Sequence, residues 1–340
     1  MNLRLIEIYH KEGMADEMDS LLHDLPVLEM WHDHLGEGES LTSVLLRADK
    51  TETVLDQIEQ CCFKDERTYR VVILPVEATL PRPEEPAEKE DQSKGGEEKD
   101  PARISTEEIY QKLSSSSEFS GGYILMMGLA SFIAGLGLLK GDAAVIIGSM
   151  VLAPLLNPNK ALALATTLAD STLARRSSLT IGVGIATALL VAVPMGFFMG
   201  VDPVTRELAL RSNVRLYYIA LALASGTAGA YTVVAGIAEA LVGVMVAVAL
   251  LPPLVASGLF AGAGMWEDAT GALLLFLVNI VGINLTGVLT FAFKGVRPKN
   301  WWEAEKASRA VKKAIAAWVF LLVIMALIIL FAPHIRQSVV

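Results

Sequence analysis

The sequence predicts a polytopic α-helical membrane protein that carries a small α+β domain at its N-terminus. Of its 340 residues, 53% are hydrophobic, and the mean hydropathy is +0.48. Charge divides the chain unevenly: residues 1–120 hold 13 Lys/Arg and 28 Asp/Glu, whereas residues 121–340 hold 15 and 9. An acidic soluble part is therefore followed by an apolar part with weakly basic loops, and no basic arm suggests nucleic-acid binding.

Residues 1–78 show alternating strand and helix patterns. The expected order is strand (Leu3–Ile8), helix (Met14–Leu22), strand (Val27–His34), strand (Leu41–Ala48), helix (Glu52–Phe63) and strand (Thr68–Val76). The order β-α-β-β-α-β is typical of ferredoxin-like domains. The N-terminus lacks the long apolar core of a signal peptide, so we expect this domain to stay in the cytoplasm.

Histidine and cysteine residues in this domain do not form a recognisable metal motif. His32 and His34 share one face of a strand, whereas His10 and His23 lie elsewhere in the sequence. A structural metal site needs three or four convergent ligands, so we expect none. Cys61 and Cys62 are adjacent, and they fit a reducing compartment better than a disulfide framework.

Residues 79–103 are rich in Pro, Glu, Lys, Asp and Gly, and we expect a disordered acidic linker there. Residues 104–120 predict a juxtamembrane helix and hinge. Ser105 and Glu108 have the spacing of a capping box, and Ile104 and Ile109 stand at staple positions. This helix is either a spacer or an element that couples the soluble domain to the membrane.

Seven apolar segments are long enough to span a bilayer. They are Gly121–Leu139, Ala143–Ala169, Leu179–Gly200, Leu216–Val234, Ile237–Leu259, Ala269–Phe293 and Ala314–Ala332. Loops on the N-terminal side carry nine Lys/Arg against five on the other side, which predicts a cytoplasmic N-terminus. We expect residues 300–340 to form an interfacial segment, anchored by Trp301 and Trp302, and the last span.

A shift of 95 residues brings two parts of the membrane region into register. Gly148-x-Met150-Val151-x-x-x-Leu155-Leu156-x-Pro158 aligns with Gly243-x-Met245-Val246-x-x-x-Leu250-Leu251-x-Pro253, and Tyr123 and Gly141 align with Tyr218 and Gly236. The repeats would comprise residues 121–215 and 216–299. Three spans in each copy would place the copies in opposite orientations, as in inverted-repeat transporters.

The second apolar segment is the one in which a site is expected. Pro154 and Pro158 interrupt it, and a broken backbone inside a bilayer requires protein or a water-filled cavity around it. Asn157 and Pro158 predict a helix restart as N-cap and first helical residue, whose free N–H groups favour an anion. Lys160 follows, either as part of the site or with its ammonium extended toward the headgroups.

Further polar or helix-breaking residues complete the candidate substrate-binding set. They are Ser149, Asn159, Glu239, Pro252, Pro253, Asn279 and Asn284. Glu239 could pair with Lys160, relay a proton or face the interface. Asn279 and Asn284 could equally hold helices together by hydrogen bonds.

The segment Ser131–Leu139, with Ile133-Ala134 and Gly137-Leu138, and the segment Ala144–Pro158 carry a family resemblance. They resemble the I-A-x-x-G-L and V-I-G-A-M-x-x-A-P-L-x-x-P motifs of the bacterial and archaeal membrane proteins called domain of unknown function 389. Ser149 replaces the usual alanine. The resemblance covers about residues 104–290 and implies a fold and a membrane location, but no substrate.

Together these features predict a transporter or channel in the inner (cytoplasmic) membrane for a small, anionic solute, with a cytoplasmic regulatory domain. The alternative is a non-transporting membrane sensor or scaffold whose soluble domain binds a ligand or partner. No catalytic motif or phosphate-binding loop is present, so we expect neither an enzyme nor a cofactor. Small-residue helix faces favour a homo-oligomer in the lipid bilayer.

Overall fold

The computed structural model describes residues 3–11, 15–22, 25–36, 38–62, 70–76, 105–237, 240–297 and 301–331, without the side chains of 15–17, 19, 59–62, 116, 240–248 and 301–307. The chain forms two compact units, Met1–Ile109 and Tyr110–Val340. The predicted linker at 79–103 lies outside the described residues.

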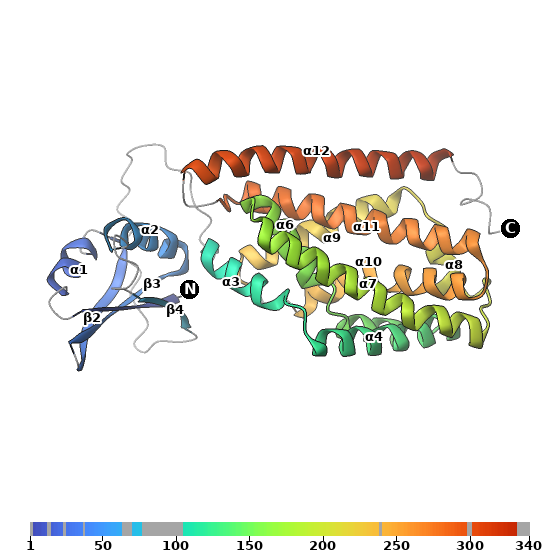
Figure 1. The fold of residues 1–340 in the computed structure, drawn as a ribbon, viewed down its shortest axis with the longest axis horizontal. Coiled ribbons are helices and arrows are strands. Elements are labelled where there is room, and N and C mark those ends of the chain that lie inside the picture. Colours follow the sequence, from blue (N-terminus) through green and yellow to red (C-terminus); the bar gives the residue numbers. More distant parts are fainter. Residues whose placement is uncertain are drawn as a thin grey trace. The chain divides into compact units, whose positions relative to one another are not determined.

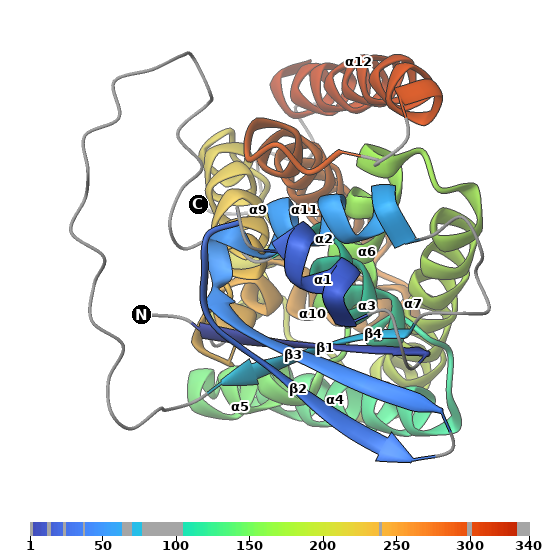
Figure 2. The same ribbon diagram turned by 90° about the vertical axis from the view of Figure 1, so that its left-hand side faces the viewer.

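The first unit is a four-stranded antiparallel sheet with two helices. Its elements are β1 (Leu3–Lys11), α1 (Ala15–Leu22), β2 (Val27–Gly36), β3 (Glu39–Arg47), α2 (Thr51–Cys62) and β4 (Arg70–Val76). The strands lie in the order β2-β3-β1-β4, with Ile6 opposite both Val44 and Ile73. Alternate residues of β1, such as Ile6 and Ile8, pack with Met18 under α1 and α2 (Figure 2). The predicted order of strands and helices is confirmed.

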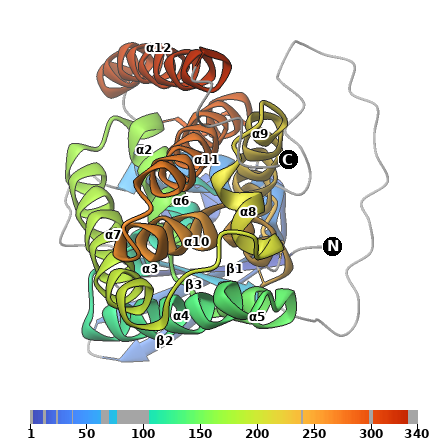
Figure 3. The same ribbon diagram turned by 90° about the vertical axis from the view of Figure 1, so that its right-hand side faces the viewer.

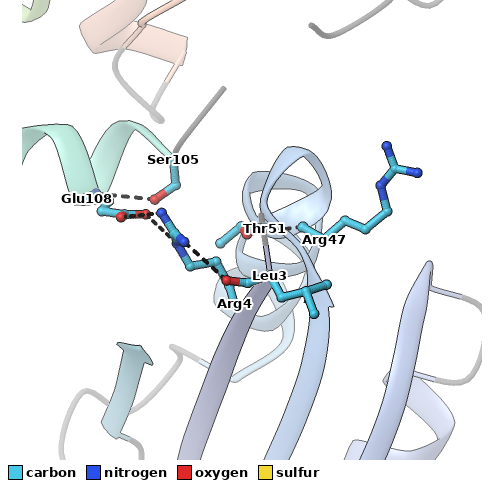
Figure 4. A network of polar contacts seen from close by, with 6 residues as sticks. All are labelled: Leu3, Arg4, Arg47, Thr51, Ser105 and Glu108. Atoms are coloured by element: carbon cyan, nitrogen blue, oxygen red, sulfur yellow. Dashed lines mark hydrogen bonds and ion pairs between the residues drawn. The ribbon is translucent and has the colours of Figure 1, made fainter. Parts of the chain in front are cut away.

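Helix α3 (Thr106–Ser116) begins as the capping pattern predicts. The Ser105 hydroxyl accepts a hydrogen bond from the Glu108 N–H at 3.2 Å, which satisfies one of the free donors of the first turn. The Glu108 carboxylate binds the Arg4 guanidinium through two atoms, at 2.8 and 3.1 Å (Figure 4). This bidentate pair fixes the first turn of α3 to β1. Ile104 lies outside the described residues.

The regular secondary structure of the second unit is all helical over its described residues. It contains the end of α3, α4 (Gly121–Lys140), α5 (Ala143–Leu152), α6 (Leu156–Leu168), α7 (Ser171–Met199), α8 (Arg206–Ser212), α9 (Tyr217–Val234), α10 (Ala240–Gly262), α11 (Trp266–Phe293) and α12 (Trp301–Phe331) (Figure 1). Within the described residues, five helices (α4, α7, α9, α11 and α12) are long and apolar enough to cross a membrane, and α5 with α6 is a candidate sixth span. These helices indicate a membrane protein.

Helix α10 lies in the middle of this unit, in contact with α4, α5, α7, α9 and α11 (Figure 3). Every residue from Ala249 to Phe260 is buried, so this part of α10 is enclosed around its whole circumference. Helix α12 packs on the outside against α11 and α6, and only 6% of its most apolar window is buried.

The predicted interruption of the second span is confirmed, but the prediction of how it restarts is wrong. The backbone leaves the helix at Ala153, and α6 runs at 51° to α5. The new helix begins at Leu156 with Leu155 as its N-cap, so Asn157 and Pro158 are its second and third residues. Pro158 is tolerated there because the first N–H groups of a helix have no acceptor in it.

The second proline-bearing helix differs from its predicted form. Pro252 and Pro253 were both expected at a break, but α10 is a continuous helix through them. The prediction that a second helix is broken, at Pro252 and Pro253, is therefore wrong. Helix α11 supplies the hydrogen-bond donor that Pro253 lacks, as described below.

The 95-residue repeat extends to the helices and their ends. Shifting α4, α5–α6 and α7 by 95 residues places them on α9, α10 and α11 within three residues at each end. The described positive-φ residues of the first copy, Gly141, Ala169 and Gly200, fall on Gly236, Gly264 and Gly295 of the second, which also have positive φ. Ala169 is the one described non-glycine residue with positive φ, at 58°.

Ala169→Gly should raise the free energy of unfolding by about 1 kcal/mol. A side chain in the left-handed region is strained, and this C-cap position favours glycine. The matched control is Gly264→Ala, where φ is +76° and no atom within 4 Å would meet the new Cβ. Gly264→Ala should lower the free energy of unfolding by a similar amount. Denaturation of both variants in detergent measures the two changes, and a loss of stability in Ala169→Gly would contradict the strain.

Candidate functional site

Two polar residues of the first turns of α6 are buried within the bundle. Asn159 is 1% exposed and Lys160 is 3% exposed. Both line an internal cavity of about 10 Å³, with the other lining residues coming from α6, α9 and α11: Leu156, Ala163, Gly226, Gly229, Ala230, Ile283, Gly287 and Phe291. This volume is about that of one water-sized probe. Lys160 thus lies inside the bundle and not on its surface.

Asn159 links α6 directly to α11. Its amide donates to the Leu155 carbonyl at 2.7 Å, and its Oδ1 accepts from Nδ2 of Asn284 at 3.0 Å. Nδ2 of Asn284 also donates to the Ile280 carbonyl at 2.9 Å. Because both partners of Nδ2 are acceptors, the orientation of this amide is set by its contacts. The first repeat and the second therefore meet through a buried amide pair.

Asn279 stabilises the proline-bearing part of α10. Pro253 has no N–H to donate to the carbonyl four residues earlier, which is that of Ala249. Nδ2 of Asn279 donates to this carbonyl at 2.6 Å. The side chain of α11 thus supplies the hydrogen bond that the proline removes, and α10 stays helical.

The remaining candidates do not meet at this cavity. Ser149 is buried, but its hydroxyl donates to the Ile146 carbonyl of its own helix at 2.6 Å. Asn157 and Pro154 are partly buried and are not among the lining residues. Pro252 and Pro253 are buried in α10, and they are not among the described lining residues either. Glu239 lies outside the described residues.

Glycines of α9 and α11 form a wall of the cavity that the sequence did not assign to a site. A Cβ on Gly226 would lie 2.6 Å from Cα of Ile283, and one on Gly287 would lie 2.8 Å from Cβ of Ala163. These contacts let α9, α11 and α6 approach closely enough to enclose Asn159 and Lys160. The spacing of Gly226 and Gly229 is the sequence signal that could have indicated α9.

Hydrogen bonds to the Asp170 carboxylate stabilise the turn between α6 and α7. The Asp170 carboxylate caps α7 by accepting from the N–H groups of Thr172 and Leu173, at 2.9 and 3.0 Å, and from the Tyr110 hydroxyl at 2.8 Å. Burial alone would raise the pKa of Asp170, but these donors and Arg176 lower it below its usual value. The same bond raises the pKa of Tyr110. Asp170 therefore stays ionised, and its carboxylate links the start of α7 to Tyr110 of α3.

In the first unit, strand pairing brings three histidines to one face of the sheet. His10 and His32 both bind the Thr42 hydroxyl at 2.8 Å, and His34 binds Ser40 at 3.2 Å. The sequence did not predict that His10 joins His32 and His34, because this depends on the register of β1, β3 and β2. Among the described residues, no His, Cys, Asp and Glu cluster has the arrangement of a metal site.

Comparison with known proteins places this helical region in a family. The profile of the family described as Domain of unknown function (DUF389) matches residues 150–285, which run from the end of α5 to α11. An uncharacterized protein of Methanocaldococcus jannaschii, MJ0678, is 34% identical over 332 residues, which cover 97% of this chain and all of the relative. The chain belongs to the DUF389 family.

The DUF389 region contains α6 with Asn159 and Lys160, α9, and α11 as far as Asn284. The buried residues described above thus lie in the part of the chain that defines the family. The resemblance inferred from the two sequence motifs is confirmed. No solved structure matches the chain significantly.

Asn279→Ala should lower the free energy of unfolding by about 1–3 kcal/mol, because the buried Ala249 carbonyl would lose its donor. The same change in a Pro253→Ala background should cost less, since the alanine introduced there would supply a backbone N–H to that carbonyl. Denaturation of the two single variants and the double variant in detergent gives the coupling energy. Equal losses in both backgrounds would contradict the proposed role of Asn279.

Proposed function

We propose that the protein is a membrane transporter or channel for a small anionic solute. The observation that carries this proposal is the break between α5 and α6, after which a buried Lys160 and a buried Asn159 line an internal cavity. A lysine buried in a membrane domain is costly and marks a functional site by default. A kink that only shapes the helix would not require a buried lysine.

The charge of the solute follows from the groups at the break. The N-terminus of α6 presents backbone N–H groups and the positive end of its dipole. Lys160 adds a positive charge one turn further on. An anion is the ligand that these groups would stabilise.

Transport is further supported by the internal repeat. In the arrangement we propose, α10 completes a set of seven spans, and the two repeats of three spans are inverted relative to each other. Such repeats place substrate sites near the midplane at interrupted helices. The paired ends at 141 and 236, 169 and 264, and 200 and 295 support the duplication itself.

We also propose that the first unit is a ferredoxin-like regulatory domain in the cytoplasm, and that the membrane is the inner (cytoplasmic) membrane. The strand order β2-β3-β1-β4 with two helices supports this fold. The chain passes from the first unit to the second within α3, so a ligand-dependent change in the domain has a short path along the chain. Small-residue faces support a homo-oligomer.

The second candidate function is that of a membrane sensor or scaffold that transports nothing. The size of the cavity favours it, because about 10 Å³ has room for one water molecule and not for a larger solute. Among the described lining residues, those near a proline come from α6, and neither Pro252 nor Pro253 of α10 is one of them. A transporter would have to open this region by moving α9 or α11 away from α6.

Reconstituted vesicles distinguish the two functions. Wild-type protein should conduct at least one member of a panel of chloride, bromide, nitrate, bicarbonate, formate and phosphate. Lys160→Ala should reduce that flux about tenfold or more, since a charge contact to an anion is worth roughly 1.5–3 kcal/mol. Lys140→Ala is the matched control, because Lys140 is exposed at the end of α4.

Unchanged flux in Lys160→Ala would refute this assignment of the site. Absence of flux for every anion in the wild-type protein, with the protein folded, would favour the sensor or scaffold.

A further inference from the structure

One face of the sheet in the first unit carries no helix of that unit. Helices α1 and α2 pack on the face that presents Ile6, Ile8 and Val44 (Figure 2). Because side chains alternate along a strand, the residues between these point to the other face. No described element of the first unit covers that second face, which we call the open face. An antiparallel sheet normally turns polar residues to an uncovered face.

The open face is instead apolar over much of its area. Trp31 and Leu74 are 39% and 38% exposed, and Leu5, Tyr9 and Leu41 are half-buried. A contiguous apolar patch of this kind marks an interaction site. The registers of β2, β3, β1 and β4 align the residues of the face in three rows: Asp33, Leu41, Tyr9 and Arg70; Trp31, Ser43, Glu7 and Val72; and Glu29, Leu45, Leu5 and Leu74.

The two edges of the open face carry opposite charges. Exposed Glu29 and Asp33 lie on the β2 edge, and exposed Arg70 lies on the β4 edge. Strands β3 and β1 separate these edges by about 14 Å, so Asp33 and Arg70 of one chain are too far apart to pair. A face with one acidic and one basic edge is complementary to itself. An anionic lipid surface, in contrast, would be repelled by Glu29 and Asp33.

A two-fold axis parallel to the strands, between β3 and β1, brings the opposite edges of two copies together. It lays β2 of one copy over β4 of the other, so Asp33 faces Arg70 of the second copy and the reverse. Near the axis, Leu45 faces Leu5 of the second copy. Packed sheets lie about 10 Å apart with their strands within about 30° of each other, and this axis allows that alignment.

The other way to stack two open faces places like charges against each other. A two-fold axis at right angles to the strands, centred on the same rows, would stack Glu7 of one copy on Glu7 of the other, and Asp33 on Glu29. Such contacts are repulsive. Under the axis parallel to the strands, Glu7 faces the neutral Ser43. The charges of the face therefore select the parallel axis.

We propose that the open face is the surface through which the first units of two copies of this chain bind each other, across a two-fold axis parallel to the strands. The three rows cover roughly 400 Å² per copy, about half of what a standard interface buries. The contact is therefore weak between separate domains, and it is strengthened when the chains are concentrated in one membrane. This inference goes beyond the proposed function, since it does not depend on solute transport and no flux result affects it.

Crosslinking of the full-length protein in lipid vesicles tests the proposal, in a background with Cys61→Ser and Cys62→Ser. Leu41→Cys and Tyr9→Cys each place one thiol beside the axis, and a bismaleimide that spans about 10 Å should join two chains at either position. Lys50→Cys is the matched control, because Lys50 is exposed in the turn before α2. It records random collisions and should crosslink at least about fivefold less.

A charge exchange on the Leu41→Cys protein tests the axis. Asp33→Arg and Arg70→Asp should each lower the crosslinking yield about fivefold or more, because the symmetry turns two attractive contacts per dimer into repulsive ones. The double variant Asp33→Arg/Arg70→Asp restores opposite charges and should recover the yield to within a factor of about two. Both side chains are exposed, so these variants should fold, and circular dichroism checks this.

Crosslinking no greater at Leu41→Cys and Tyr9→Cys than at Lys50→Cys would overturn the proposal. Labelling by a monofunctional maleimide would then show either a bare face or, where Leu41→Cys resists it, a face covered by another part of the same chain. A double variant that crosslinks no better than Asp33→Arg alone would also overturn the proposal, because Asp33 would not face Arg70 of the second copy.

Discussion

The helical unit depends on how it satisfies the backbone groups that two equivalent prolines leave unpaired. Pro158 and Pro253 stand 95 residues apart in the repeat, and each lacks the N–H that a helix interior requires. Inside an apolar bundle, water does not replace that donor. In the second repeat, Asn279 supplies it and α10 stays continuous. In the first repeat, the residue equivalent to Asn279 is Gly184, and the span breaks before α6.

This difference concentrates polarity on one side of the repeat interface. The break starts a new helix whose first turns carry Asn159 and Lys160, whereas the equivalent positions in α10 are the apolar Leu254 and Val255. Asn159 accepts a hydrogen bond from Asn284 in α11, and this bond links the polar first copy to the second. Close glycine-mediated packing of α9 against α11 keeps this region nearly closed. Solute passage would therefore require a second, more open arrangement of these helices.

Much of this arrangement could be predicted from local sequence patterns. Apolar length indicated α4, α5–α6, α7, α9, α10, α11 and α12, proline indicated the interruption before α6, and the repeated motif indicated the correspondence of α5–α6 with α10. The capping residue Ser105 was recognisable for the same reason, because its partner lies three residues away. A feature can be predicted from the sequence when its interacting residues lie within one helical turn, or when its residues recur at a fixed spacing.

What could not be predicted depends on contacts between distant residues. Pro252 and Pro253 have the identity of helix breakers, yet α10 is continuous, and the Ala249 carbonyl that Pro253 leaves without a donor is bound by Asn279, 30 residues away. Asn157 has the identity of an N-cap, but the backbone is already helical at Leu155, two residues earlier. The pairing of His10 with Thr42 likewise depends on strand register.

An experimental density map of the protein in a lipid nanodisc would test the central claim most directly. We expect a helix interrupted between Leu152 and Leu156, a continuous α10 through Pro252 and Pro253, and ligand density at the N-terminus of α6 when a transported anion is present. A single unbroken helix from Ala143 to Leu168, with Lys160 at the lipid headgroups, would contradict it.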